Sequence, residues 1–96
     1  MLFIATCIDK PLSVDRRMEN RPAHLTFLNG LGARVKTAGA LLAADHKTPV
    51  GSMMVFEGES EDDILALLAK DPYALAGLFE SVSVKPWRPA VGQMFM

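Results

Sequence analysis

The sequence predicts an α+β fold whose elements run β-α-β-β-α-β, and three observations support this order. Residues 2–8 form a continuous apolar run, which is typical of a strand buried on both faces. Residues 51–58 and 79–87 have the composition of strands, and the second alternates approximately between apolar and polar side chains. Two segments with apolar residues at helical spacing separate these strands. This order of elements is that of the ferredoxin-like fold.

The first helix is expected over residues 20–31. Leucines recur there at three-residue spacing, Pro22 suits the first turn of a helix, and Gly30 provides a stop signal. Residues 12–19, which precede this helix, are expected to form a mobile or briefly helical entry segment.

A β-hairpin is expected next, with strands in residues 33–46 and 51–58 and a polar turn at residues 45–49. The alanines of the first strand also permit a helix, but Gly39 weakens that alternative. The hairpin therefore supplies the second and third strands along the chain.

The second helix is expected to begin after Ser60, which starts a pattern resembling a capping box, and to break at Asp71 because Pro72 follows it. A short helical piece over residues 72–78 and the last strand over residues 79–87 complete the order. Residues 89–96 form an apolar tail without helix signals.

Length and charge indicate one domain over residues 1–96 that binds neither nucleic acid nor a membrane. The chain has 10 basic and 11 acidic residues, a net charge of −1, so it has no basic surface for nucleic acid or anionic lipid. No apolar stretch approaches the length of a membrane span. The single cysteine excludes an intramolecular disulfide and fits a reducing compartment, so we expect a cytoplasmic protein.

The open face of the four-stranded sheet predicts a homodimer or a larger oligomer. Helices are expected on one face only, and the first strand is apolar on both. Met53 and Val55 lie opposite Met54 and Phe56 in the strand pattern, so the second face is expected to be apolar as well. Such a face calls for a partner.

His24 is the side chain with the clearest chemical potential. Helical spacing places it on one face with Leu28 and Leu31, and a helix that begins near residue 20 places it in the first turn. Burial and the positive end of the helix dipole then favour the neutral imidazole, which is the form that a general base requires. The alternative is a histidine at the edge of the core, satisfied by a backbone carbonyl.

Asp71 suits two roles. Directly before Pro72 it is a good N-cap, and its second oxygen is free to orient His24. Tyr73 lies in the first turn of the same short helix, where it either lines the pocket or simply packs. Arg21, near His24 in the chain, is a candidate for holding an anionic substrate, although a solvated surface arginine is the alternative.

Other candidate sites lack the required pattern. Ser52 has no evident base partner, Cys7 lies in an apolar run that makes its thiol inert, and His46 belongs to a polar turn. The spacing of the two histidines and of the acidic residues predicts no metal site, and no cofactor is implied.

Four short segments together resemble the YciI-like (YCII-related) family: RPAHL at 21–25, TAG at 37–39, DPY at 71–73 and VSVKPW at 82–87. The resemblance covers nearly the whole chain in order. It implies a dimeric α+β barrel built from ferredoxin-like protomers and a pocket with a His-Asp dyad, carried onto His24 and Asp71. Related barrels include muconolactone isomerase and a dehydrochlorinase.

The resemblance therefore implies a small cofactor-independent lyase, isomerase or dehydrochlorinase that acts on a small organic molecule. His24 and Asp71 would be its catalytic pair, and Arg21 and Tyr73 would bind the substrate. The alternative is a non-catalytic module for binding a small ligand or for assembly. A purely structural role, with His24 in the core and Asp71 as a cap, also remains open at this point.

Overall fold

A computed structural model describes residues 1–92 of the chain and confirms the α+β fold. The order of elements is the predicted β-α-β-β-α-β, with the second helix in two pieces and a short 3₁₀ turn at Gly32–Arg34 after the first. The elements are β1 (Leu2–Asp9), α1 (Val14–Gly30), β2 (Val35–Leu42), β3 (Pro49–Glu57), α2 (Glu61–Leu68), α3 (Pro72–Leu75) and β4 (Phe79–Trp87).

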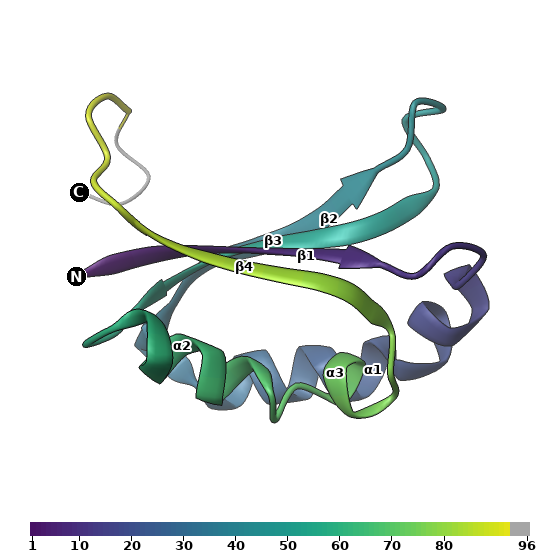
Figure 1. The fold of residues 1–96 in the computed structure, drawn as a ribbon, viewed down its shortest axis with the longest axis horizontal. Coiled ribbons are helices and arrows are strands. Elements are labelled where there is room, and N and C mark those ends of the chain that lie inside the picture. The colour runs from purple at the N-terminus through teal and green to yellow at the C-terminus, as the bar shows by residue number, and fades with distance from the viewer. Residues whose placement is uncertain (93–96) are drawn as a thin grey trace.

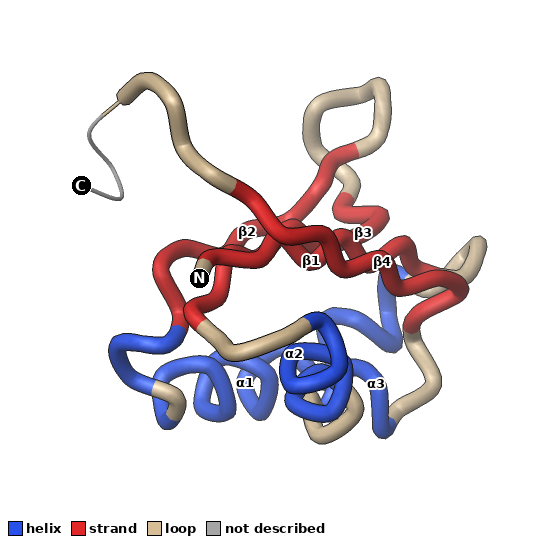
Figure 2. Tube along the Cα trace, turned by 60° about the vertical axis from the view of Figure 1, so that its left-hand side comes forward, coloured by secondary structure: helices blue, strands red, loops and turns tan. Residues whose placement is uncertain are grey.

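The four strands form one antiparallel sheet in the order β2-β3-β1-β4. All three helices cover the same face of the sheet, and within residues 1–92 no helix covers the opposite face (Figure 1). The rotated view in Figure 2 shows the helices again on one side of the strands. The molecule therefore has two layers, and any site built by helices and strands together lies between them.

The core lies between the sheet and the helices because alternate side chains of β1 point toward the helical layer. Phe3, Ala5 and Cys7 are buried there, and β3 contributes Met54 and Phe56 beside them. The apolar stripe of α2 closes the core from the other side with Ile64 and Leu68. Burial of these side chains is the main source of stability in a domain of this kind.

Cys7 is inert, as its apolar surroundings in the sequence predict. Burial raises the pKa of its thiol from 9.0 to about 12, and the negative charges of Asp71 and Asp9 add to the rise. The nucleophilic thiolate is therefore essentially absent near neutral pH.

The uncovered face is apolar over the central strands but polar over β4, so the sequence expectation of an apolar face holds only in part. Ile4 pairs with Val55 on one side, and although this pair is apolar, Val55 is only 1% exposed. On the other side Ile4 pairs with Lys85, and Thr6 pairs with Ser83. Serine, lysine and threonine therefore border an apolar centre.

The first helix is longer than predicted, since α1 begins at Val14 rather than near residue 20. Pro22 lies inside it, and the segment expected to be a mobile entry is mostly helical. The buried side chains of α1 are Arg17, His24 and Leu28, which share one face. Because a charged residue occupies the first buried position, the apolar pattern that marks a helix is missing there.

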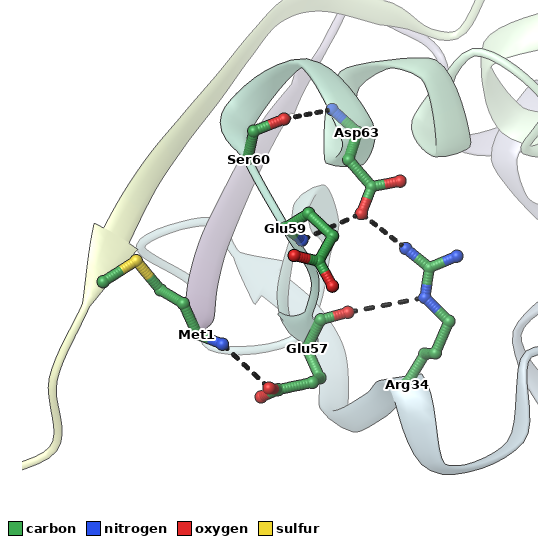
Figure 3. Close-up of polar contacts among 6 residues, drawn as sticks. All are labelled: Met1, Arg34, Glu57, Glu59, Ser60 and Asp63. Atoms are coloured by element: carbon green, nitrogen blue, oxygen red, sulfur yellow. Dashed lines mark hydrogen bonds and ion pairs between the residues drawn. The ribbon is translucent and has the colours of Figure 1, made fainter.

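The second helix begins at the predicted cap. The Ser60 hydroxyl accepts a hydrogen bond from the Asp63 backbone N–H at 3.1 Å, and the Asp63 carboxylate accepts one from the Glu59 N–H at 3.1 Å. Figure 3 shows these contacts, together with Arg34 donating to Asp63 at 3.0 Å. Two otherwise unpaired N–H groups at the helix start are thereby satisfied.

The strand expected at residues 79–87 is confirmed as β4. The end of the apolar tail, residues 93–96, lies outside the described residues. Within residues 1–92, no helix combines the length and the apolar character needed to cross a bilayer.

Candidate functional site

The structure brings His24 and Asp71 into direct contact, although 47 positions separate them in the chain. Nδ1 of His24 lies 2.9 Å from Oδ1 and 2.9 Å from Oδ2 of Asp71. Only 6% of His24 is exposed, and Asp71 is fully buried. A carboxylate in such a position needs partners for its charge and its lone pairs, and the imidazole is one of them.

Asp71 also caps α3, as the Asp-Pro sequence predicts. Its backbone is extended, Pro72 occupies the first helical position, and Oδ1 accepts a hydrogen bond from the Tyr73 N–H at 2.9 Å. One carboxylate thus holds a helix end and an imidazole at once. The sequence allows both contacts together, and the structure shows both, although Oδ1 takes part in each of them.

The hydrogen bonds assign the tautomer of His24. An ionised carboxylate only accepts, so Nδ1 carries a proton, and in the neutral form of the imidazole Nε2 has the free lone pair. Among residues 1–92 Nε2 has no hydrogen-bond partner, and no side-chain nitrogen or oxygen is both buried and unpaired. Nε2 is therefore open to the cavity that His24 lines.

The sequence argument for a neutral imidazole at the positive helix end is wrong, because His24 lies in the middle of α1 rather than in its first turn. The predicted face of the helix is nevertheless right, since His24 and Leu28 are both buried. The main electrostatic partner of the imidazole is therefore the Asp71 carboxylate, and not the positive end of the helix.

Tyr73 stacks on the imidazole, with the ring centroids 3.9 Å apart and the planes at 15°. Phe79 contacts the tyrosine ring edge-on, with the centroids 6.1 Å apart. Burial raises the pKa of the Tyr73 hydroxyl, and the positive charges of Arg17 and Arg21 oppose that rise. Tyr73 therefore both packs in the core and lines the cavity, so neither sequence alternative excludes the other.

A buried polar network that no sequence pattern predicted lies next to this pair, and it is formed by Arg17, Asp9 and Ser52. Arg17 donates to both Asp9 oxygens, from Nε at 2.7 Å and from Nη2 at 3.0 Å, and Nη2 also donates to Ser52 Oγ at 2.8 Å. The Arg17 guanidinium carbon lies 4.6 Å from the centroid of the Tyr73 ring. The seven-residue spacing from His24 was the available signal, since it places Arg17 on the same helix face.

The bidentate pair keeps Arg17 charged despite its burial. Burial alone lowers the pKa of Arg17, but the hydrogen bonds and the charge of Asp9 outweigh it, so the pKa is raised above its ordinary value. Ser52, which has no base beside it, accepts from this guanidinium and keeps its own hydroxyl proton for another acceptor.

One cavity of about 130 Å³ lies between α1, α3 and the β2–β3 edge of the sheet, and Arg17 and Ser52 are among the residues that line it. Of the four sequence candidates, His24, Tyr73 and Arg21 line it directly, and Asp71 lies behind His24. Apolar and small residues complete the wall: Leu25, Leu28, Ala38, Gly39, Ala40 and Met54.

A larger hollow of about 470 Å³ lies elsewhere, around the residues of Figure 3. Two ion pairs hold four of its five charges: the Met1 amine pairs with Glu57 at 2.8 Å, and Arg34 pairs with Asp63, which leaves only the Glu59 carboxylate. These groups are largely exposed, so the interactions are weak and screened by solvent. We therefore assign the candidate site to the smaller cavity, where the polar groups are buried and directed inward.

Comparison with known proteins supports the family resemblance. Residues 1–88 match the model of the YCII-related domain. Protein YciI of Escherichia coli is 39% identical, with 92% of this chain and 97% of that protein covered. An uncharacterised protein of Haemophilus influenzae is 32% identical over the same share of both chains.

A solved structure shares the fold closely. It is the 5-chloro-2-hydroxyhydroquinone dehydrochlorinase TftG of Burkholderia phenoliruptrix, in complex with 2,5-dihydroxybenzoquinone. TftG is 35% identical, with a TM-score of 0.86 and coverage of 94% of this chain and 96% of its own. Protein Atu4242 of Agrobacterium tumefaciens, at 14% identity and a TM-score of 0.57, shares the fold alone. The match of the domain model and the identity to YciI establish that this chain belongs to the YCII-related family.

Proposed function

We propose that this protein is a small enzyme that performs cofactor-independent general acid–base chemistry on a small organic substrate, as a lyase, isomerase or dehydrochlorinase. The contact of His24 Nδ1 with both oxygens of buried Asp71 carries the proposal, because it leaves Nε2 as a proton acceptor at the cavity. Asp71 holds the imidazole in this tautomer and balances the charge of the imidazolium once a proton has been taken up.

In the proposed step, Nε2 of His24 removes a proton from an activated O–H or C–H group of the substrate. The electron pair of that bond forms a new C=O or C=C bond, and the double-bond pair that it displaces takes up a proton at another carbon or oxygen. On a chlorinated hydroxyhydroquinone that proton goes to the carbon that bears chlorine; a second hydroxyl then loses its proton, its O–H pair forms the second C=O bond, the ring pair shifts to a new C=C bond, and chloride departs with the C–Cl pair. Negative charge develops on a substrate oxygen during this shift. The Ser52 hydroxyl, polarised by Arg17, supplies a hydrogen bond to that oxygen.

The dehydrochlorinase TftG supports an elimination as the first reaction to test, because it shares 35% identity and the fold. We therefore propose halogenated hydroxyhydroquinones as trial substrates, with release of chloride ion as the measurement. Loss of a proton and a chloride ion from such a ring requires no redox partner.

The matched test uses the two histidines of the chain. His24→Asn removes the proposed base, whereas His46→Asn makes the same change in the exposed β2–β3 turn, where φ is +64° and asparagine is well tolerated. We expect chloride release by the parent and by His46→Asn, and only the buffer rate with His24→Asn. Equal rates for the two variants would overturn the role of His24. Ligand binding without turnover in any protein would favour the alternative of a binding module.

We also propose a homodimer that packs through the uncovered sheet face. Met53, which is 38% exposed, lies at the apolar centre of that face. Sedimentation equilibrium is expected to give twice the mass of one chain for the parent, and the mass of one chain for Met53→Lys because a buried lysine charge opposes association. Met18→Lys, which changes an exposed methionine of α1, is the control and should remain dimeric. A monomeric parent would contradict the proposal.

A further inference from the structure

Arg21 is an exposed cation at the cavity that has no counter-charge. Within residues 1–92 it makes no hydrogen bond or ion pair, whereas Arg17 is held by Asp9 and Arg34 by Asp63. It lines the cavity beside His24, and its charge opposes the rise that burial causes in the pKa of the Tyr73 hydroxyl. An arginine without a partner at the edge of a cavity is free to bind an incoming anion.

The charges around the cavity are arranged with the carboxylates outside it. Asp9 lies behind Arg17 and Asp71 behind His24, and neither carboxylate lines the cavity. The lining residues include two arginines and no acid. A ligand therefore meets positive charge and hydrogen-bond donors, an arrangement that disfavours cations and favours anions.

The size and the walls of the cavity favour a planar ring. Its volume of about 130 Å³ is comparable to that of an apolar cavity of about 150 Å³ that binds benzene. Leu25, Leu28 and Met54 supply apolar surface, and the small side chains at residues 38–40 leave room for a flat molecule.

The helix sets the distance between anion and reacting atom. Arg21 and His24 are three positions apart on α1, so their Cβ atoms are separated by roughly 5–6 Å. Both side chains therefore leave the helix close together and line the same cavity, so one small ligand can meet both.

We propose that the substrate of this site is an anion, a small planar ring whose ionised oxygen, carboxylate or phenolate, pairs with Arg21 while the reacting proton faces His24. This inference rests on the proposed function. It is narrower, because a neutral ring would satisfy the chemistry of His24 equally well.

The test compares benzoate with benzamide, two rings of the same size that differ in charge, by calorimetric titration near neutral pH. We expect benzoate to bind the parent about tenfold more tightly than benzamide, as a charge-assisted hydrogen bond allows. The preference should vanish in Arg21→Gln, survive in Arg21→Lys, and weaken as salt is added. Arg21 is exposed and makes no hydrogen bond or ion pair within residues 1–92, so both variants should remain folded.

Lys70→Gln is the matched control, because it removes the same charge from an exposed position outside the cavity, and it should keep the preference. Equal binding of the two ligands to the parent, absence of binding by both, or a preference that survives in Arg21→Gln would each overturn the inference. His24→Asn separates this outcome from the proposed function: it should abolish turnover and still prefer benzoate.

Discussion

Replacing Asp71 with asparagine is expected to lower turnover by about 10²–10⁴-fold, the usual contribution of general acid–base catalysis, while the protein stays folded. Asparagine still accepts a hydrogen bond from the Tyr73 N–H and so preserves the cap of α3. It presents an amide in place of a carboxylate to Nδ1, so it no longer enforces one tautomer and no longer balances the charge of the imidazolium.

Two measurements separate these effects. Nitrogen-15 chemical shifts of the imidazole are expected to show a proton on Nδ1 in the parent and a mixture of tautomers in Asp71→Asn. Asp71→Ala should lose the same activity and, in addition, about 1 kcal/mol of stability with the lost cap. If Asp71→Asn keeps the parent rate, the carboxylate serves the helix alone.

Replacing Asp9 with asparagine is expected to reduce the free energy of unfolding by about 3–5 kcal/mol, because it leaves a buried charge on Arg17 without its partner. Only 5% of the Arg17 side chain and 4% of the Asp9 side chain are exposed, so solvent cannot replace the lost carboxylate. Urea unfolding followed by circular dichroism measures the loss.

Asp63→Asn is the control for Asp9→Asn. It breaks the same kind of pair, Arg34 with Asp63, at a site where the two side chains are 42% and 34% exposed. A small change is expected there, because exposed ion pairs contribute little. Similar losses in both variants would show that burial of the Arg17–Asp9 pair does not determine its contribution.

The order of the elements and most of their boundaries were predictable because they depend on local signals. The last strand follows from alternation and aromatic content, and the start of the second helix from Ser60. The start of α1 was missed because Pro22 imitates a first turn and because the buried position before it holds Arg17. Apolar periodicity does not detect a helix face that contains an ion pair.

Part of the site was predictable in its residues, whereas Arg17 and all of the contacts were not. Helical spacing placed His24 on the inner face, and the Asp-Pro sequence identified the cap. The distance from His24 to Asp71 depends on how α1 and α3 pack against each other on one face of the sheet. No spacing of residues along the chain encodes this packing. Ser52 was set aside for lack of a base, although its partner is a guanidinium that no sequence pattern places there.

Asp71 both caps α3 and contacts His24, so its presence in a relative does not by itself indicate the same function. A relative that has lost the reaction still needs the carboxylate to start its short helix, so selection for folding alone retains an Asp-Pro pair at this point. The imidazole at position 24 bonds no backbone group, so only the charge of Asp71 and the proposed reaction would retain it. In a search for relatives that share the proposed reaction, the aspartate by itself is therefore not diagnostic, and the histidine must accompany it.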